Sequence, residues 1–191
     1  MQTEQHYHRL PKQIERTPIT RIITHKNCPD GMASAMLLNR AFPGVEIEFK
    51  AYGDPIEVTE GMLFCDFSPP ESTIEEHQKV KTIILDHHPT AKPIVDAMGE
   101  RGYWGRNSHG ESGAWLAYNV LRTLKPINSV HKRFASLAGI RDTWQKDNLL
   151  WRKSCEQATV LMFYPPEYWL NPWRSYGPSL SPEEEELGLH L

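Results

Sequence analysis

The stretch Ile83-Ile84-Leu85-Asp86-His87-His88 decides the fold of this chain. A short apolar run that is rich in β-branched residues is typical of a buried strand. This run ends directly in one carboxylate and two imidazoles. In open α/β sheets, ligands bind just beyond the carboxyl ends of the strands. The stretch therefore predicts a strand that delivers three metal-binding or acid–base groups to the edge of a sheet where such folds carry out chemistry.

Further strands and helices are expected on both sides of this stretch. Apolar runs or apolar–polar alternation predict three more strands, at 21–24, 45–52 and 62–65. Apolar residues at helical spacing predict helices at 32–41, 71–80, 112–124, 129–139 and 148–163. Strands that alternate with helices predict an α/β fold with a doubly wound, mainly parallel sheet. We expect flanking helices on this sheet and a helical second half of the chain.

The composition favours one soluble domain. The chain has 191 residues, of which 39% are hydrophobic and 24% charged. We expect a loose lead-in over residues 1–18, a catalytic domain over 19–165, and an irregular, Pro/Trp-rich tail with a solvated acidic run over 166–191. Apolar runs stay well short of the roughly 18–20 residues that span a membrane, so no membrane partner is expected.

Charge and cysteine content limit the class of protein further. The formal net charge of −3 gives no overall basic field for nucleic acid, although a local basic groove stays open as an alternative. The three cysteines, Cys28, Cys65 and Cys155, are widely spaced and odd in number. This pattern argues against a disulfide framework and predicts a reducing, cytoplasmic location.

Candidate metal ligands follow three of the expected strands and one helix. The first strand leads into a turn with His25 and Asp30, the third ends at Asp66, the fourth ends in the triplet, and Asp142 follows a helix. Mixed imidazole and carboxylate ligands suit Mn²⁺, Fe²⁺ or Zn²⁺ better than Ca²⁺. A carboxylate shared between two ions about 3.5–4 Å apart is usual in two-metal phosphoryl hydrolysis, and Asp66 is the natural bridge.

With these motifs the chain resembles the DHH phosphoesterase superfamily, which is named for the triplet found here at Asp86-His87-His88. The resemblance covers roughly residues 20–150, and the motifs occur in the same order. The segments that carry it are His25-Lys26-Asn27-Cys28-Pro29-Asp30-Gly31, Tyr52-Gly53-Asp54-Pro55, Asp66-Phe67-Ser68 and Leu85-Asp86-His87-His88-Pro89-Thr90-Ala91. In this form they are similar to a branch of the superfamily found in bacteria and phages.

The resemblance implies a metal-dependent phosphoesterase that hydrolyses phosphodiester bonds of short oligonucleotides or (cyclic) nucleotides with a water activated by two cations. It implies two Mn²⁺ ions as the first choice, with Mg²⁺, Fe²⁺ or Zn²⁺ as alternatives. One ion would be held by His25, an acidic residue of the first turn and Asp66, and the other by Asp30, Asp66, His87 and Asp142. Asp86 would lie behind them and orient a histidine, and His88 would face the substrate phosphate as a hydrogen-bond donor or acid.

The first motif departs from the usual pattern. The superfamily has an additional Asp two residues before the Asp-Gly pair, and here that position is Cys28, beside Asn27. Both are candidate ligands: an amide is weak, whereas a soft thiolate would favour Zn²⁺ or Fe²⁺ over Mn²⁺. The alternative for Cys28 is an inert, buried residue, because free cysteine often simply packs.

Candidate substrate contacts precede the helix at 112–124. Ser108 or Ser112 is expected to cap this helix, and helix N-termini accept phosphate readily. His109 resembles superfamily positions that approach the substrate. Arg141 is a candidate cationic contact, and its alternative is an ordinary surface charge.

Two further expectations concern the whole molecule. Most enzymes of this superfamily carry a second, substrate-binding domain with a glycine-rich motif, and no such motif is present in this sequence. We therefore expect a homo-oligomer in which the aromatic, Pro-rich end forms the interface. The alternatives to a phosphodiesterase are a pyrophosphate or polyphosphate hydrolase and a catalytically degenerate protein that binds a nucleotide or another protein.

Overall fold

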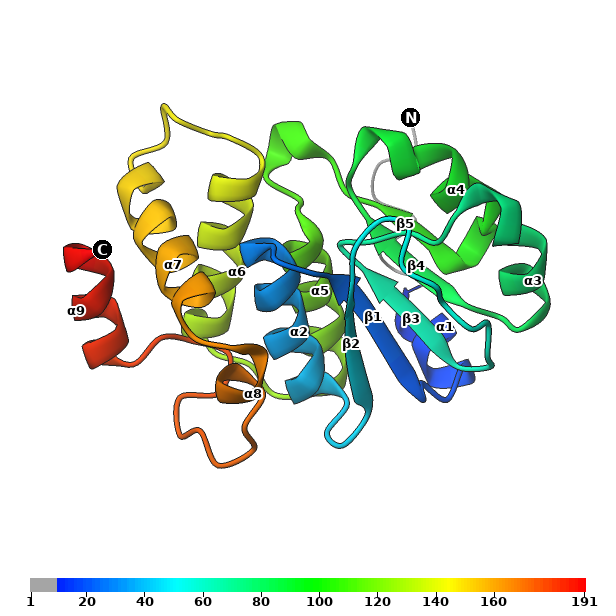
Figure 1. Cartoon of the computed structure of the whole chain (residues 1–191), viewed down its shortest axis with the longest axis horizontal. Coiled ribbons are helices and arrows are strands. Elements are labelled where there is room, and N and C mark those ends of the chain that lie inside the picture. The colour runs from blue at the N-terminus through cyan, green and yellow to red at the C-terminus, as the bar shows by residue number, and fades with distance from the viewer. Residues whose placement is uncertain (1–9) are drawn as a thin grey trace.

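The structure, a computed structural model that describes residues 10–191, is built around a parallel β-sheet (Figure 1). Its strands are β1 (Arg21–His25), β2 (Glu46–Lys50), β3 (Met62–Cys65), β4 (Ile83–Asp86) and β5 (Gly102–Trp104). They lie in the order β2-β1-β3-β4-β5, and all neighbouring pairs are parallel. The expected α/β fold with a mainly parallel sheet is confirmed.

The order of the strands reverses at β1. The chain runs from β1 to β2 on one side and then crosses back to place β3 on the other side of β1. In open α/β sheets the crevice at such a reversal, outside the carboxyl ends of the strands, is where ligands bind. His25 is the last residue of β1 and Asp66 directly follows β3. The topology therefore places two of the predicted ligands at this crevice.

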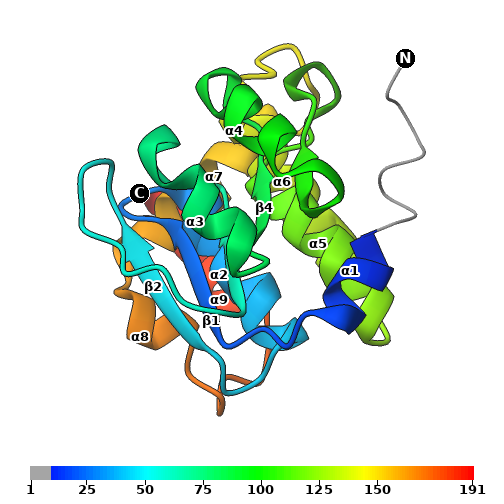
Figure 2. The same cartoon turned by 90° about the vertical axis from the view of Figure 1, so that its right-hand side faces the viewer.

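Helices cover both faces of the sheet, because alternate residues of the central strands are apolar on both sides. Ile22, Leu63 and Leu85 face one side, where α2 (Pro29–Ala41) and α5 (Gly113–Leu124) complete the larger core. Ile23, Phe64 and Ile84 face the other side. Two short helices, α3 (Ile74–Lys79) and α4 (Lys92–Ala97), lie on that side and are nearest the viewer in Figure 2.

The second half of the chain adds a further layer of helices outside α2 and α5 (Figure 1). α6 (Ser129–Asp142) packs against α2 and α5, and α7 (Trp151–Phe163) packs against α2 and α6. The expected helical second half is thus confirmed. α6 extends three residues beyond the predicted end, so Asp142 lies in its last turn rather than after it.

Two short elements are missing from the sequence-based expectations. The segment 92–104 contains α4 and β5, whereas no helix or strand was expected between the triplet and residue 112. β5 has three residues, too few to show a strand period, and it is recognisable only by its pairing with β4. Single-turn 3₁₀ helices complete the fold: η1 (Glu71–Thr73), η2 (Pro89–Ala91), η3 (Gly99–Arg101) and η4 (Asn107–His109).

The expected loose lead-in is wrong for the part that the structure describes. Residues Leu10–Arg16 form the helix α1, which contacts α5 and η3. Leu10 and Ile14 are buried in the larger core. Residues 1–9 of the expected lead-in lie outside the described residues.

The expected irregular, solvated tail is also wrong. It contains α8 (Pro166–Trp169) and α9 (Pro182–His190), and α9 packs on α7. Glu184, in the acidic run, is buried and forms an ion pair with Arg174. It also completes a capping box with Ser181 at the start of α9. A run of glutamates here starts a packed helix, because acidic side chains are favourable at a helix N-terminus.

Within residues 10–191, none of the helices combines the length and apolar character needed to cross a lipid bilayer.

Candidate metal centre

Ends of strands and helices converge at the crevice and bring the predicted ligands together. β1 ends in His25, β4 ends in Asp86 and leads into His87 and His88, and Asp66 directly follows β3. Asp30 lies in the first turn of α2, and Asp142 is the last residue of α6. Three sets of side chains have ligand atoms that lie within 4.8 Å of one another, and one of them, Asp66, His87 and His88, shares a residue with each of the other two. We call Asp30, His87 and Asp142 the inner group, and His25, Cys28 and Asp66 the outer group.

Asp66 lies between the two groups. Its side chain is fully buried, and its backbone has a φ of 59° in the left-handed region. Among non-glycine residues, aspartate tolerates this conformation relatively well, and such strained positions concentrate at functional sites. Its Oδ1 lies 3.0 Å from His87 Nε2, and its Oδ2 lies 3.5 Å from Cys28 Sγ. One carboxylate therefore reaches both groups, as expected for a bridging ligand.

Gly113 lets the start of α5 approach this carboxylate. A Cβ at position 113 would lie 2.3 Å from Asp66 Cβ and 2.9 Å from Asp30 Oδ2. No side chain fits at such distances, so the spacing of Asp30 and Asp66 depends on glycine at this position.

His87 is the centre of the inner group. Its Nε2 lies 3.0 Å from Asp66 Oδ1, 3.3 Å from Asp142 Oδ2 and 3.8 Å from Asp30 Oδ2. Its Nδ1 lies 2.8 Å from the side-chain oxygen of Asn107, which fixes the proton on Nδ1 when the ring is neutral. The lone pair of Nε2 then points toward three carboxylates, and only a proton or a cation placed among them makes this arrangement favourable.

The pKa values of the inner group reflect the same crowding of carboxylates around His87. Burial, together with the neighbouring Asp66, raises the pKa of Asp30 to about 7. Burial and the nearby Asp30 raise the pKa of Asp142 to about 6. Burial opposes the charged form of His87, but its hydrogen bond to Asp66 and the surrounding carboxylates raise its pKa to about 10. The group thus holds protons strongly where a divalent cation would supply the positive charge instead.

Asp30 is held in place by the N-terminal end of α5. It accepts hydrogen bonds from Ser112 Oγ at 2.7 Å and from the backbone N–H of Ala114 at 3.2 Å. The expectation that the side chain of Ser108 or Ser112 caps this helix is wrong, because Ser112 makes no capping hydrogen bond and donates to Asp30 instead. The helix N-terminus, which we expected to be available to phosphate, is satisfied by this internal carboxylate.

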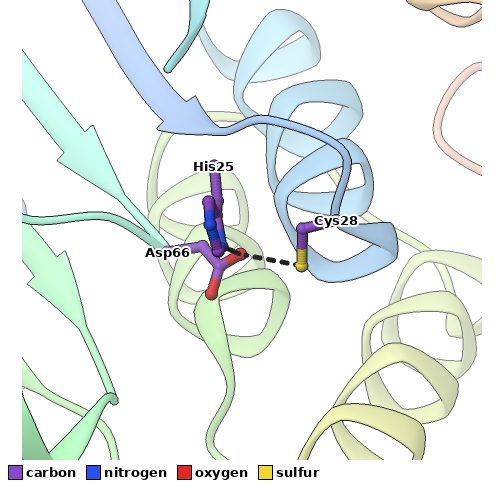
Figure 3. A group of neighbouring side chains, drawn as sticks. All are labelled: His25, Cys28 and Asp66. Atoms are coloured by element: carbon purple, nitrogen blue, oxygen red, sulfur yellow. Dashed lines mark hydrogen bonds and ion pairs between the residues drawn. The ribbon is translucent and has the colours of Figure 1, made fainter. Parts of the chain in front are cut away.

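The outer group lies on the β1 side of Asp66 (Figure 3). His25 Nδ1 is 4.0 Å from Asp66 Oδ2, and this buried nitrogen has no hydrogen-bond partner. Burial and the nearby carboxylates raise the pKa of the Cys28 thiol well above its usual range, so without a cation it is a neutral donor to Asp66. An unpartnered buried nitrogen facing a thiol and a carboxylate fits a metal ion well.

Asp86 lies behind the ligands, and the histidine that it orients is His88. It accepts hydrogen bonds from Ser68 Oγ at 2.6 Å, from His88 Nδ1 at 2.7 Å and from the backbone N–H of His87 at 2.7 Å. Burial disfavours its charge, but these hydrogen bonds lower its pKa below the usual value. His88 is consequently held with Nε2 directed away from Asp86, and Asp86 raises its pKa against the effect of burial.

Sequence reasoning missed the role of Asn107. This residue is the first of η4, which begins after a short connection that follows β5, and it orients His87 through Nδ1. The residues that follow it were expected only to start a helix and to contact substrate. The available signal was its place just beyond the end of a strand next to β4, but that strand was itself too short to predict.

The candidate substrate residues are placed less centrally. Ser108 and His109 are exposed, and their side chains hydrogen-bond to each other. Arg141 lines a small pocket together with Asp30 and Asp142. Asn27 is exposed in a left-handed turn with a φ of 54°, which explains an asparagine there as a turn residue.

Comparison with known proteins identifies no family: no protein-family model matches the sequence, and no curated protein matches it significantly. Inference about function therefore depends on the motifs and on the geometry described above.

Proposed function

We propose that this protein is a metal-dependent phosphoesterase of the DHH type that hydrolyses phosphodiester bonds of short oligonucleotides or (cyclic) nucleotides. One observation carries the proposal: Asp66 joins two adjacent ligand groups, and His87 Nε2 faces three carboxylates. Two neighbouring cation sites that share a carboxylate are typical of enzymes that hydrolyse phosphate esters.

The residues of the two groups would hold two divalent cations. Bound there, these ions would neutralise phosphate charge and increase the acidity of a water molecule. Mn²⁺ fits the imidazole and carboxylate ligands of the inner group.

His88 would act on the substrate. Asp86 fixes its Nδ1 and favours the protonated ring, so Nε2–H can donate to the phosphate or to the leaving oxygen. Its side chain is partly exposed, which allows this contact. In the proposed step, a water molecule loses one proton to solvent and adds to phosphorus, the P–O ester bond breaks, and His88 supplies a proton to the departing oxygen and regains one from solvent.

Two exposed aromatic side chains favour a nucleotide substrate. Tyr52 is 60% exposed, and its ring centroid lies 5.4 Å from that of His25. Trp144 is 54% exposed and follows Asp142 by two residues, with Arg141 and Lys146 over its ring. Aromatic rings beside cationic side chains stack on nucleobases of any sequence. Tyr52 thus lies beside the outer group, and Trp144 lies close along the chain to Asp142 of the inner group.

The test is hydrolysis by purified protein that has first been freed of metal. With Mn²⁺ added, we expect turnover of a linear dinucleotide, a short oligonucleotide or a cyclic dinucleotide. His87→Ala and Asp66→Ala should each abolish it. Asp96→Asn is a matched control, because Asp96 is an exposed partner of Lys92 on α4. Full turnover by both site variants would remove the proposal.

Cys28 favours a second candidate, a catalytically degenerate nucleotide-binding protein. It occupies a position where the superfamily has an acidic ligand. Tight nucleotide binding without turnover in Mn²⁺, Mg²⁺, Fe²⁺ and Zn²⁺ would support this candidate. Release of phosphate from pyrophosphate or polyphosphate, with no action on diesters, would support the phosphoanhydride alternative.

The expected homo-oligomer remains a proposal. Trp173, near the end of the chain, is 89% exposed, which would suit an interface. A monomeric mass by light scattering at micromolar concentration would contradict it.

A further inference from the structure

The outer group combines three different ligand types from three separate segments. His25 comes from the end of β1, Cys28 from the turn before α2, and Asp66 from the residue after β3, and Figure 3 shows the three side chains directed toward one another. Their ligand atoms all lie within 4.8 Å of one another. Neighbouring ligands in a tetrahedral zinc site, with bonds of about 2.0–2.3 Å, are about 3.3–3.8 Å apart. The outer group is therefore already close to the spacing that one small ion needs.

His25 supplies an independent sign of a missing ligand. Its Nδ1 is buried and has no hydrogen-bond partner, although its ring is fixed among Tyr52, Phe67 and His88. A buried polar atom without a partner costs free energy. A cation between His25, Cys28 and Asp66 would satisfy this nitrogen.

Cys28 does not behave as a packing cysteine. It stands at the N-cap position of α2, where Ser, Thr, Asp or Asn is usual, yet its side chain makes no capping hydrogen bond and points to Asp66. Cys65 shows the contrast, since it is fully buried in the larger core and its thiol donates to the backbone of Gly113. The start of a helix also stabilises a thiolate once its proton has been lost.

We propose that Cys28 is a thiolate ligand and that the outer group binds a thiophilic divalent ion, Zn²⁺ or Fe²⁺, while the inner group takes a harder ion such as Mn²⁺. This inference rests on the proposed function, because it assigns the metals of the same centre. The inner group offers only nitrogen and oxygen ligands, whereas the outer group offers one soft sulfur. When the ion binds, the thiol proton leaves to solvent and the sulfur–metal bond forms. Three protein ligands leave a position open for water or phosphate, as catalytic sites require.

Cobalt titration of the full chain tests the sulfur ligand directly. Co²⁺ bound to a thiolate gives a sulfur-to-metal charge-transfer band in the near ultraviolet. We expect this band in the wild-type protein and in Cys155→Ser, and its loss in Cys28→Ser. Cys155 is the matched control, because it is a partly exposed cysteine on α7 that belongs to neither group. A cobalt-saturated wild type without the band, or an equal band in Cys28→Ser, would overturn the inference.

A second variant measures metal preference. Cys28→Asp restores an acidic ligand of the superfamily type, and we expect the ratio of Zn²⁺ to Mn²⁺ affinity to fall at least about tenfold. An unchanged ratio in this folded variant would count against a sulfur ligand.

Equilibrium dialysis separates failure of the inference from failure of the proposed function. Two bound ions without a thiolate band would contradict only the assignment of Cys28. Failure of the wild type to bind any divalent ion would overturn both proposals.

Discussion

The inner and outer groups differ in how completely the fold arranges them. The inner group is fixed from all sides: Asp30 by the start of α5, His87 by Asn107, and Asp142 by the end of α6. The outer group lies at the turn after β1 and contains a buried nitrogen that has no partner. Protein contacts therefore fix the positions of the inner side chains, with a proton or a cation among their carboxylates, whereas the outer group leaves a buried nitrogen that no protein contact satisfies.

This difference shows where the centre can vary. Asp30 of the inner group also accepts hydrogen bonds from the start of α5, so a residue without an acceptor oxygen at this position would disturb the fold as well as the site. Cys28 supports neither a helix cap nor the core. A ligand of another type can stand there at little structural cost, and the properties of the metal change with it.

The largest effect is expected where the two groups meet. Asp66→Asn would remove the anionic ligand that both groups share, so both ions should bind poorly. Loss of several kcal/mol of charge stabilisation corresponds to a decrease in kcat of about a thousandfold or more. Metal content by elemental analysis and turnover of a dinucleotide check this. Loss of only one ion would show that the groups are independent.

A smaller effect should separate the inner group from the outer one. Asn107→Ala removes the partner of His87 Nδ1, and loss of such an orienting contact weakens metal affinity about 10- to 100-fold. Asn107→Asp keeps an acceptor oxygen and should rescue binding. Calorimetric titration with Mn²⁺ measures both, and the thiolate band of bound Co²⁺ should persist in both. An alanine variant with wild-type affinity would argue against the orienting role.

The exposed aromatic side chains of Trp144 and Tyr52 should affect how tightly a dinucleotide binds. Trp144→Ala should raise KM for a dinucleotide roughly tenfold, because stacking on one base contributes about 1–3 kcal/mol, and kcat should change little. Trp144→Phe should retain part of this contact. Tyr52→Ala makes the corresponding test beside the outer group. Equal KM values for all variants would exclude base stacking on these rings.

The smallest effect concerns stability without metal. Because the pKa of Asp30 is raised to about 7, the folded protein keeps its proton at pH 5 and must bury its charge at pH 8. This carboxyl therefore destabilises the fold as pH rises from about 4 through 7. Asp30→Asn should raise Tm by a few degrees at pH 8 and by clearly less at pH 5, since 1 kcal/mol corresponds to about 2–4 °C in a chain of this size.

Thermal unfolding of metal-free wild type and variant at both pH values measures this difference. Excess Mn²⁺ should stabilise the wild type more than the variant. A Tm difference that is equal at pH 5 and pH 8 would contradict the prediction.

Much of this architecture could be predicted from the sequence, because the central strands are short, apolar runs that end in candidate ligands. Ile83–Asp86 and Met62–Cys65 are predicted within a residue or two of their observed bounds. Helix ends were harder, as the extension of α6 to Asp142 shows, because no terminating residue marks the change. β5 could not be predicted, because it is defined as a strand only by its pairing with β4, and no local sequence pattern indicates this pairing.

The candidate site divides in the same way. His25, Asp30, Asp66, His87 and Asp142 could be singled out because they follow predicted elements. Hydrogen bonds across the fold could not be predicted in this way. Asn107 bonds to His87 and Ser112 to Asp30, and these pairs are 20 and 82 positions apart in the sequence. From the sequence, the Ser112 side chain was expected to cap its own helix, but in the structure it donates a hydrogen bond to Asp30 instead.

Gly113 has a consequence for how such a sequence can change over generations. Any mutation that adds a side chain there pushes against Asp66 and Asp30 together, so no compensating change at a single ligand can restore the centre. Position 28 can accept other residues, and the preferred metal changes with them, whereas position 113 can accept only glycine. Sequences descended from a common ancestor should therefore vary their cysteine more freely than this one glycine.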